Sequence, residues 1–254
     1  MGVSMQTAEM WVERWERQQR RYAVDREERF TVIADVVEHV CAGRPRPLLL
    51  DLGCGPGSLS ARLARRLPDA EIVAVDMDPV LLELGRTHHP DAAHYVDTVI
   101  GADGWTDALG LRRPLDAAVS TTALHYLDEA TLLGTYRALA ALLRPGGALV
   151  NGDHFPPGTT PCAGLTAHVG RRRAERTGCH DHEDWRTWWA QASQEPELAD
   201  LFAERARRRP PQGVSGAEDL SLDRHTDLLH RAGFGEVTPV WQFGDSRVLV
   251  AVRQ

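Results

Sequence analysis

The chain opens with a long amphipathic pattern. Apolar residues recur every three or four positions over residues 8–41, and neither proline nor glycine interrupts them before Gly43. Trp11, Trp15 and Tyr22 fall on one face of this pattern, which is the spacing of an α-helix. We therefore predict a helical N-terminal cap over residues 1–45, closed by the prolines at 45 and 47.

Apolar runs and helical patterns then alternate over residues 46–154. Buried strands are predicted around 48–51, at 72–76, within 94–102, at 115–121 and at 148–152. Helices are predicted at 59–67, at 79–88 and from an Asp128 cap to 143. This alternation is typical of a doubly wound α/β domain with a mostly parallel sheet, in which ligands bind at the carboxyl ends of the strands.

The alternation stops over residues 155–215, between two proline-rich stretches. We interpret this segment as a helical insertion that forms a lid over the ligand end of the sheet. Residues 216–254 then complete the core. They are predicted to form a helix capped by Ser221 and ended by Gly233, followed by a hairpin that turns at Gly244 and Asp245.

Composition excludes several classes of function. The 254 residues carry a formal net charge of −7, which argues against a general nucleic-acid groove. Every basic side chain besides histidine is an arginine, so lysine chemistry is excluded. The four cysteines are scattered, and no apolar run approaches the ~20 residues that span a membrane. The N-terminus has no apolar segment of a secretory signal, so we expect a cytoplasmic protein.

The glycine-rich turn after the first strand carries the strongest chemical signal. Residues 48–57 read LLLDLGCGPG, and Ser58 stands where a dinucleotide-binding G-x-G-x-x-G turn has its third glycine. An acidic residue two positions before G-x-G-x-G resembles motif I of the class I methyltransferases, which bind S-adenosylmethionine (SAM). The resemblance covers roughly residues 46–152 and 221–254, and implies a seven-stranded, mostly parallel sheet with an antiparallel C-terminal hairpin.

This resemblance also implies a set of cofactor contacts. Asp76 would accept hydrogen bonds from the ribose hydroxyls, Met77 would pack on adenine, and Asp103 would recognise adenine. Asp103 has a plain turn carboxylate as its alternative, and Trp105 can equally fill the core. The full set implied is Tyr22, Arg26, Asp51, Gly53, Gly55, Gly57, Asp76, Met77, Asp103, Gly104, Trp105 and Ser120.

Candidates for proton transfer follow the fourth and fifth strands. His125, His154 and Asp153 lie where a general base belongs, although each histidine can equally be a wall residue. The aromatic candidates for substrate binding are Trp11, Trp15, Tyr22, Trp185, Trp188 and Trp189, with lid core as the alternative. The acidic and histidine residues at 180–183 do not share a helix face, so we predict no metal site and an N-cap at Asp181.

These features predict a SAM-dependent methyltransferase that moves a methyl group to oxygen, nitrogen or carbon of a small, aromatic or heteroaromatic metabolite of bacterial secondary metabolism. S-adenosylhomocysteine (SAH) would be the product. The expected partner is a small molecule, with no nucleic acid or membrane, and the protein would be a monomer or homodimer. Methylation of RNA or protein, SAM binding without transfer, and a nicotinamide dehydrogenase are the alternatives.

Overall fold

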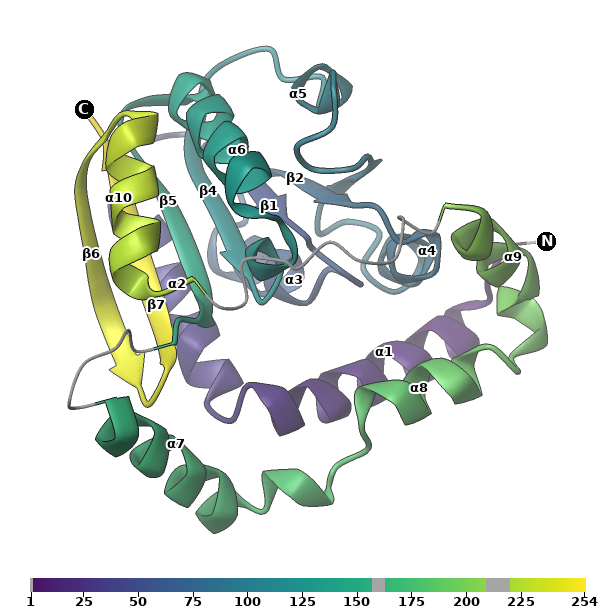
Figure 1. The fold of residues 1–254 in the computed structure, drawn as a ribbon. Helices are drawn as coiled ribbons and strands as arrows, with labels where there is room; N and C mark the ends of the chain where they lie inside the picture. Colours follow the sequence, from purple (N-terminus) through teal and green to yellow (C-terminus); the bar gives the residue numbers. More distant parts are fainter. Residues whose placement is uncertain (1, 157–162, 209–219) are drawn as a thin grey trace.

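The computed structural model describes residues 2–156, 163–208 and 220–254. Within these residues, one seven-stranded sheet runs through the molecule in the order β3-β2-β1-β4-β5-β7-β6 (Figure 1). Strands β1 to β5 pair in parallel, and β7 is antiparallel to both of its neighbours. This confirms the predicted doubly wound sheet and its antiparallel hairpin. The strands are β1 Leu48–Leu52, β2 Glu71–Asp76, β3 His94–Asp97, β4 Leu115–Thr121, β5 Leu143–His154, β6 Phe234–Phe243 and β7 Ser246–Arg253.

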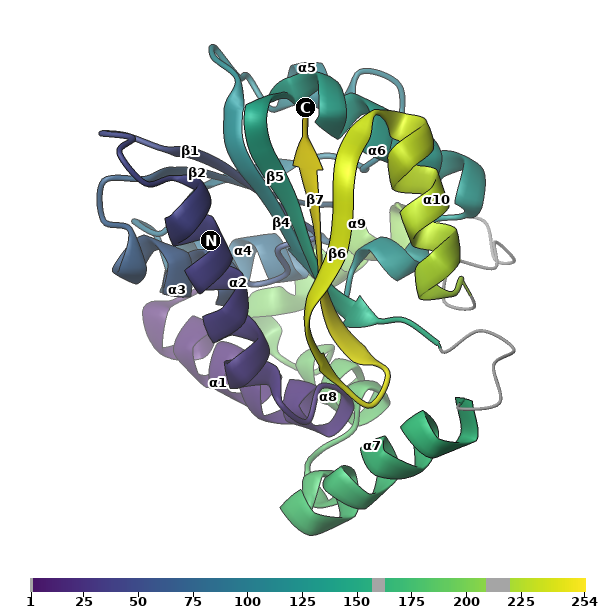
Figure 2. The same ribbon diagram turned by 90° about the vertical axis from the view of Figure 1, so that its left-hand side faces the viewer.

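Helices cover both faces of the sheet (Figure 2). The helices α6 (Glu129–Leu142) and α10 (Leu222–Ala232), together with the short α5 (Trp105–Ala108), pack on one face. The helices α2 (Arg26–Val40), α3 (Ser58–Arg66) and α4 (Pro79–His88) cover the other. The central strands are buried on both faces, which explains why they read as unbroken apolar runs.

Local capping signals set several helix ends as predicted. Asp128 accepts a hydrogen bond from the Thr131 amide at 2.8 Å, and Ser221 caps α10 through the Arg224 amide. Gly233 ends α10 with a φ of +104°, a conformation that favours glycine. Strand β5 is longer than the predicted 148–152, because Leu143 already pairs with Leu115 ahead of an irregularity in the register.

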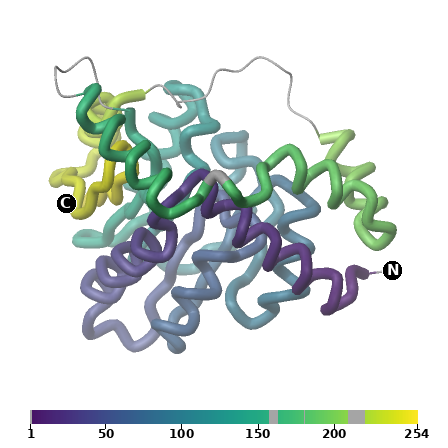
Figure 3. Tube along the Cα trace, turned by 90° about the horizontal axis from the view of Figure 1, so that it is seen from below, coloured from purple at the N-terminus to yellow at the C-terminus, as the bar shows by residue number. Residues whose placement is uncertain are grey.

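The N-terminal pattern forms two helices, so the prediction of continuous helix over 8–41 is wrong at residues 23–25. Helix α1 is Met5–Tyr22, and the chain bends before α2 begins at Arg26. The two helices have different partners: α1 lies along the insertion helix α8 (Trp185–Ala192), while α2 packs on the sheet (Figure 3). The carboxylate of Asp25, in the bend, pairs with Arg173 at 2.8 Å.

The insertion is helical where it is described. It contains α7 (Ala163–Thr177), α8 and α9 (Ala199–Arg207), and two ion pairs join its last part to the core: Arg205 with Asp78, and Arg208 with Asp97. The N-cap of α8 is Asp184, so the predicted cap at Asp181 is wrong; residue 181 ends a short 3-10 turn. Residues 157–162 and 209–219, which include the predicted domain boundary at 215–216, lie outside the described residues.

Candidate active site

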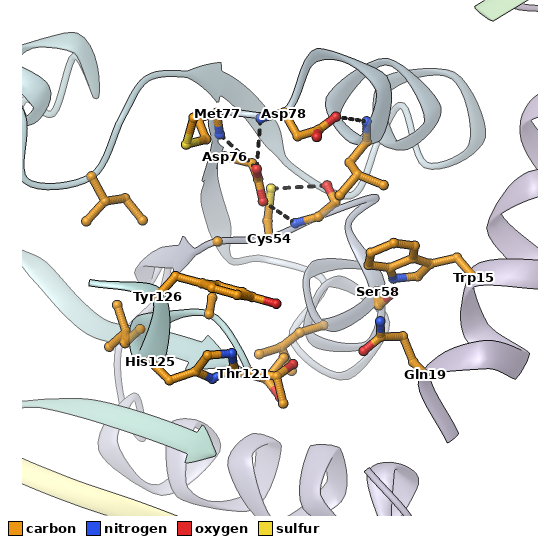
Figure 4. Close-up of a pocket in the computed structure, with 18 of the residues that line it drawn as sticks. Trp15, Gln19, Cys54, Ser58, Asp76, Met77, Asp78, Thr121, His125 and Tyr126 are labelled. Atoms are coloured by element: carbon orange, nitrogen blue, oxygen red, sulfur yellow. Dashed lines mark hydrogen bonds between the residues drawn. The ribbon is translucent and has the colours of Figure 1, made fainter. Parts of the chain in front are cut away.

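A cavity of about 920 Å³ lies at the carboxyl ends of the parallel strands. Its floor and walls come from the turns that follow β1 to β4, and its roof from α1, α8 and α9. Asp76 and Met77 lie at one end, His125 and Tyr126 lie at the other, and Trp15 projects from α1 (Figure 4). This is the position that a doubly wound sheet provides for a ligand.

The turn after β1 depends on glycine for two different reasons. Gly53 and Gly55 line the cavity, and a Cβ atom on Gly53 would come 2.2 Å from the Cβ atom of Ala123. Gly57 is not among the lining residues. Its φ is +80°, and a Cβ atom there would lie 2.2 Å from the Tyr95 hydroxyl. Gly57 therefore serves packing, Gly55 exposes bare backbone to the cavity, and Gly53 does both.

Asp76 is held rigidly at the edge of the cavity. Its Oδ2 accepts from the Gly55 amide at 2.8 Å, and its Oδ1 accepts from the amides of Met77 and Asp78 at 2.8 and 3.0 Å. Burial raises the pKa of this carboxyl above its ordinary value, although the backbone amides act against that rise. A carboxylate has about four acceptor sites, so about one site remains for a ligand.

Asp51 lies behind the turn and is not a lining residue. It is completely buried; its Oδ2 accepts from the Ser60 hydroxyl at 2.6 Å, and its Oδ1 has no hydrogen-bond partner. Burial raises the pKa of Asp51 to about 7. An unpaired buried acceptor is costly, so the Oδ1 atom is suited to a donor that arrives with a ligand or a water molecule.

The remaining implied cofactor residues after β3 and β4 lie elsewhere. Strand β3 ends at Asp97, well before Asp103. Asp103 and Gly104 are exposed and do not line the cavity, and Trp105 packs in the core. The hydroxyl of Ser120 donates to the Leu52 carbonyl at 2.9 Å, beneath the surface of the cavity.

Three residues that the sequence did not single out replace them in the wall. Thr98, Val99 and Ile100 follow β3 directly and line the cavity. The signal that could have located them is the rule that binding residues follow a strand end, applied to a strand ending at 97. Strand β3 lies within the predicted range of 94–102, but the apolar residues at 99 and 100 prolong its pattern, so the sequence left the end of the strand open.

Tyr22 and Arg26 both line the cavity, although they belong to two different helices. Tyr22 ends α1, and its hydroxyl accepts from the Trp185 amide at 2.9 Å. Arg26 begins α2 and pairs with Glu16, while its guanidinium lies over the Phe30 ring. The bend between the helices brings both side chains to the same wall.

His125 and Asp153 form a pair at the end of the cavity. The Nδ1 atom of His125 lies 2.9 Å from the Asp153 Oδ1, and the imidazole lines the cavity, with 19% of the side chain exposed. Asp153 is 2% exposed. Its burial raises the pKa of this carboxyl, but the hydrogen bond from His125 and the charges of His125 and Arg29 outweigh that effect and lower it. The carboxylate thus stays ionised behind the imidazole.

His154 has a different environment. Its Nε2 lies 3.4 Å from the Arg29 guanidinium, and its Nδ1 lies 3.3 Å from the Asp245 carboxylate. A guanidinium can only donate, so Nε2 accepts and Nδ1 carries the proton that faces Asp245. Both ring nitrogens of His154 are therefore engaged within the protein, so His154 is poorly suited to take a proton from a ligand.

The loop that carries His125 contains a strained residue. Thr122 has a φ of +49°, the one positive φ of a residue other than glycine in the described chain. Its amide donates to the Gly152 carbonyl at 3.0 Å, which joins the end of β4 to β5. A β-branched residue in this conformation is strained, and such strain is characteristic of functional sites.

Some of the tryptophans line the roof of the cavity, and the others pack in the hydrophobic cluster behind that roof. Trp15, Trp185 and Trp189 line the cavity, whereas Trp11 and Trp188 are buried behind them. The rings meet edge to face, with Trp15 and Trp188 centroids 5.1 Å apart, and the Arg205 guanidinium lies 3.8 Å from the Trp189 ring centroid. The structure thus brings part of the predicted aromatic set to the ligand and uses the rest to pack α1 against α8.

Among residues 2–156, 163–208 and 220–254, no three histidine, cysteine or acidic side chains are grouped so that they could hold a metal ion. None of the helices described within those ranges combines the length and the apolar character needed to cross a bilayer.

Comparison with known proteins agrees with this geometry. Residues 49–147, which carry the glycine turn and Asp76, match the family described as "Methyltransferase domain". Residues 49–147 therefore form a methyltransferase domain. The match covers the methyltransferase core from β1 to the start of β5, and leaves α1, α2 and the insertion outside it.

Curated relatives match about the same part of the chain. The chain is 38% identical over 124 residues to a trans-aconitate 2-methyltransferase of Methylobacterium radiotolerans, and the match covers 48% of this chain and 44% of that protein. It is 31% identical over 146 residues to a ubiquinone biosynthesis O-methyltransferase of Xanthomonas campestris, covering 56% and 57%. The chain thus spans about half the length of the curated relatives it matches.

Solved structures show the same fold. An O-methyltransferase family protein from Burkholderia thailandensis superposes with a TM-score of 0.54 at 18% identity, over 88% of this chain and 56% of that one. The magnesium protoporphyrin IX methyltransferase from Synechocystis, with bound SAH, gives 0.56 at 17% identity, over 96% and 94%.

Proposed function

We propose that the protein is a SAM-dependent methyltransferase that methylates a hydroxyl group of a small aromatic molecule. The observation that carries the proposal is one cavity with Asp76 and the bare glycine turn at one end and His125, backed by the buried Asp153, at the other. Its volume of about 920 Å³ has room for two ligands side by side.

The cofactor end of the cavity fits SAM. Asp76 keeps a free acceptor site for a ribose hydroxyl, Gly53 and Gly55 let a ligand lie on the backbone, and the unpaired Oδ1 of Asp51 marks a buried need for a donor. When bound, SAM supplies a methyl carbon activated by its sulfonium. The protein's task is then to align the acceptor with that carbon and exclude water.

The acceptor end of the cavity supports transfer to oxygen. An acceptor hydroxyl arrives protonated, and the imidazole of His125 can take that proton. The Asp153 carboxylate holds the proton of the neutral ring on Nδ1, so Nε2 is the basic nitrogen of His125, and the charge of Asp153 stabilises the imidazolium that results. An acceptor without a proton to lose would not require this pair.

The aromatic roof supports an aromatic acceptor. Trp15, Trp185, Trp189 and Tyr126 present ring surfaces to the cavity. Two arginine clusters, at residues 171–173 and 207–209, give little support to RNA methylation, because Arg172, Arg173 and Arg208 pair with acidic side chains. A role in bacterial secondary metabolism stays a prediction from the sequence.

The test uses SAM with a labelled methyl group and a panel of phenols matched with their methyl ethers. We expect mass spectrometry to find label in phenols and none in ethers, and calorimetry to find SAH binding. His125→Ala should lower transfer by about a hundredfold or more while SAH affinity is retained. His94→Ala, which changes an exposed histidine at the other end of the sheet, is the matched control. Absence of SAH binding, or full transfer by His125→Ala, would refute the proposal.

A further inference from the structure

A second cavity of about 390 Å³ adjoins the main one. It lies between the end of α1, helix α7 and the turn that joins β6 to β7. Tyr22 and His154 line both cavities, so the two cavities adjoin at these side chains. The family match at residues 49–147 includes none of the residues that line this second cavity.

Arginine side chains dominate the charge of the second cavity. Arg21, Arg171 and Arg173 line it, against the carboxylates of Asp25 and Asp245. Arg173 is paired with Asp25 at 2.8 Å, and Asp245 faces His154. Arg171 has no hydrogen bond or ion pair to any part of the chain that the structure describes.

This surplus of positive charge is local. The chain as a whole carries a formal charge of −7, so its general field repels anions. A guanidinium binds carboxylate and phosphate oxygens with two parallel hydrogen bonds, which favours an anion over other ligands. Two carboxylates, of Asp25 and Asp245, offset part of this charge, so the three guanidinium groups leave an excess of one positive charge that favours a negatively charged group.

The wall that carries Arg171 and Arg173 is held in place by backbone packing. Helix α7 passes the β6–β7 turn so closely that a Cβ atom on Gly244 would lie 3.0 Å from the Gly170 Cα atom. The guanidinium of Arg173 also lies over the Phe243 ring, with 5.8 Å to its centroid. These contacts position the arginines of α7 over the cavity before any ligand binds.

We propose that the second cavity receives an anionic substituent, a carboxylate or a phosphate, of the methyl acceptor whose hydroxyl lies at His125. This inference rests on the proposed function, because it assigns the acceptor to the main cavity. The acceptor is then a small aromatic hydroxy compound with an acidic group beyond the ring. Arg171 binds that acidic group on the far side of Tyr22 and His154, which line both cavities.

Calorimetry with the full chain tests the inference directly. The probes are hydroxyphenylpropionate, its uncharged amide, and hydroxyphenethyl phosphate. We expect the anionic probes to bind at least about tenfold more tightly than the amide, since charge-assisted hydrogen bonds are the stronger ones. The tighter of the two anions distinguishes a carboxylate acceptor from a phosphate acceptor.

Two variants and a control separate this site from general effects. Arg171→Gln should weaken the anionic probes by about tenfold to a hundredfold and leave the amide unchanged. Ala167→Phe, which fills the cavity from an exposed position of α7, should also abolish the preference for anions. Arg172→Gln is the control, because Arg172 pairs with Glu175 and does not line the cavity.

Equal affinity for the amide and the anions, no binding of either anion, or equal effects of Arg171→Gln and Arg172→Gln would overturn the inference. A parallel titration with SAH distinguishes failure of this inference from failure of the proposed function. If SAH binds but the anionic probes bind no better than the amide, only the second site is removed.

Discussion

Replacing Asp153 by asparagine tests the pairing at the acceptor end of the cavity. Asparagine has the same shape and can still accept the hydrogen bond from His125 Nδ1, but it carries no charge. The carboxylate is 2% exposed and lies 2.9 Å from the imidazole, so solvent screens the interaction little. The substitution therefore removes the charge and retains the geometry.

The size of the effect follows from this geometry. A hydrogen bond to a charged group contributes about 1.5–3 kcal/mol, and each 1.36 kcal/mol changes a rate by about tenfold. If the imidazole is protonated as the methyl group is transferred, kcat should fall by about tenfold to 150-fold. The affinity for SAH should change little, because Asp153 does not line the cavity.

The assay follows SAH formation with a phenol that the wild-type protein accepts, together with a thermal melt of each variant. Asp116→Asn is the matched control. This carboxylate is also buried and pairs with Arg144, but it lies at the start of β4, at the end of the strand opposite to the cavity. It should lower stability without lowering kcat. Equal kcat values for Asp153→Asn and wild type, or equal losses in both variants, would refute the assigned role of the pair.

Three further predictions concern the cofactor end of the cavity. Asp76→Ala should weaken SAH binding in calorimetry by about 1.5–3 kcal/mol, the contribution of the one acceptor site left free; unchanged affinity would remove the ribose assignment. Gly57→Ala should lower the free energy of unfolding in urea by at least about 1 kcal/mol, because its φ is +80° and Tyr95 occupies the space; Gly104→Ala, also at positive φ but in open space, should cost less. Burial of Asp51 should make the free energy of unfolding depend on pH. Because the pKa of Asp51 is about 7 in the folded protein, its protonated form stabilises the fold below about pH 4, and this contribution is lost as the pH rises to about 7. Asp51→Asn should therefore stabilise the protein by up to a few kcal/mol at pH 8 and by little at pH 4, and parallel melts with equal gains would contradict this account.

Features that depend on local sequence could be predicted closely. Strand β4 and helix α4 have the predicted bounds, because apolar runs and capping residues act over a few positions. The bend between α1 and α2 could not be predicted in this way. No proline or glycine marks residues 23–25, and the bend arises because α8, far along the chain, packs on α1 and not on α2.

In the candidate site, too, features set by local sequence could be predicted, whereas features set by distant packing could not. His125 and Asp153 were each singled out, but their pairing depends on the register between β4 and β5, which sets Thr121 opposite Gly152. That register brings Asp153, near the end of β5, close to the residues that follow β4. Asp51 and Ser120 were placed at the right strand ends, yet their side chains point into the protein, and a strand pattern does not decide which of two buried faces adjoins a ligand.

The crowding of tryptophans in the roof gives the protein a built-in optical reporter. Five of its seven indoles, at positions 11, 15, 185, 188 and 189, lie in or directly behind the cover of the cavity. Intrinsic fluorescence from this protein therefore originates mainly where ligands would sit, and quenching or a spectral shift on titration would follow occupancy without any attached dye.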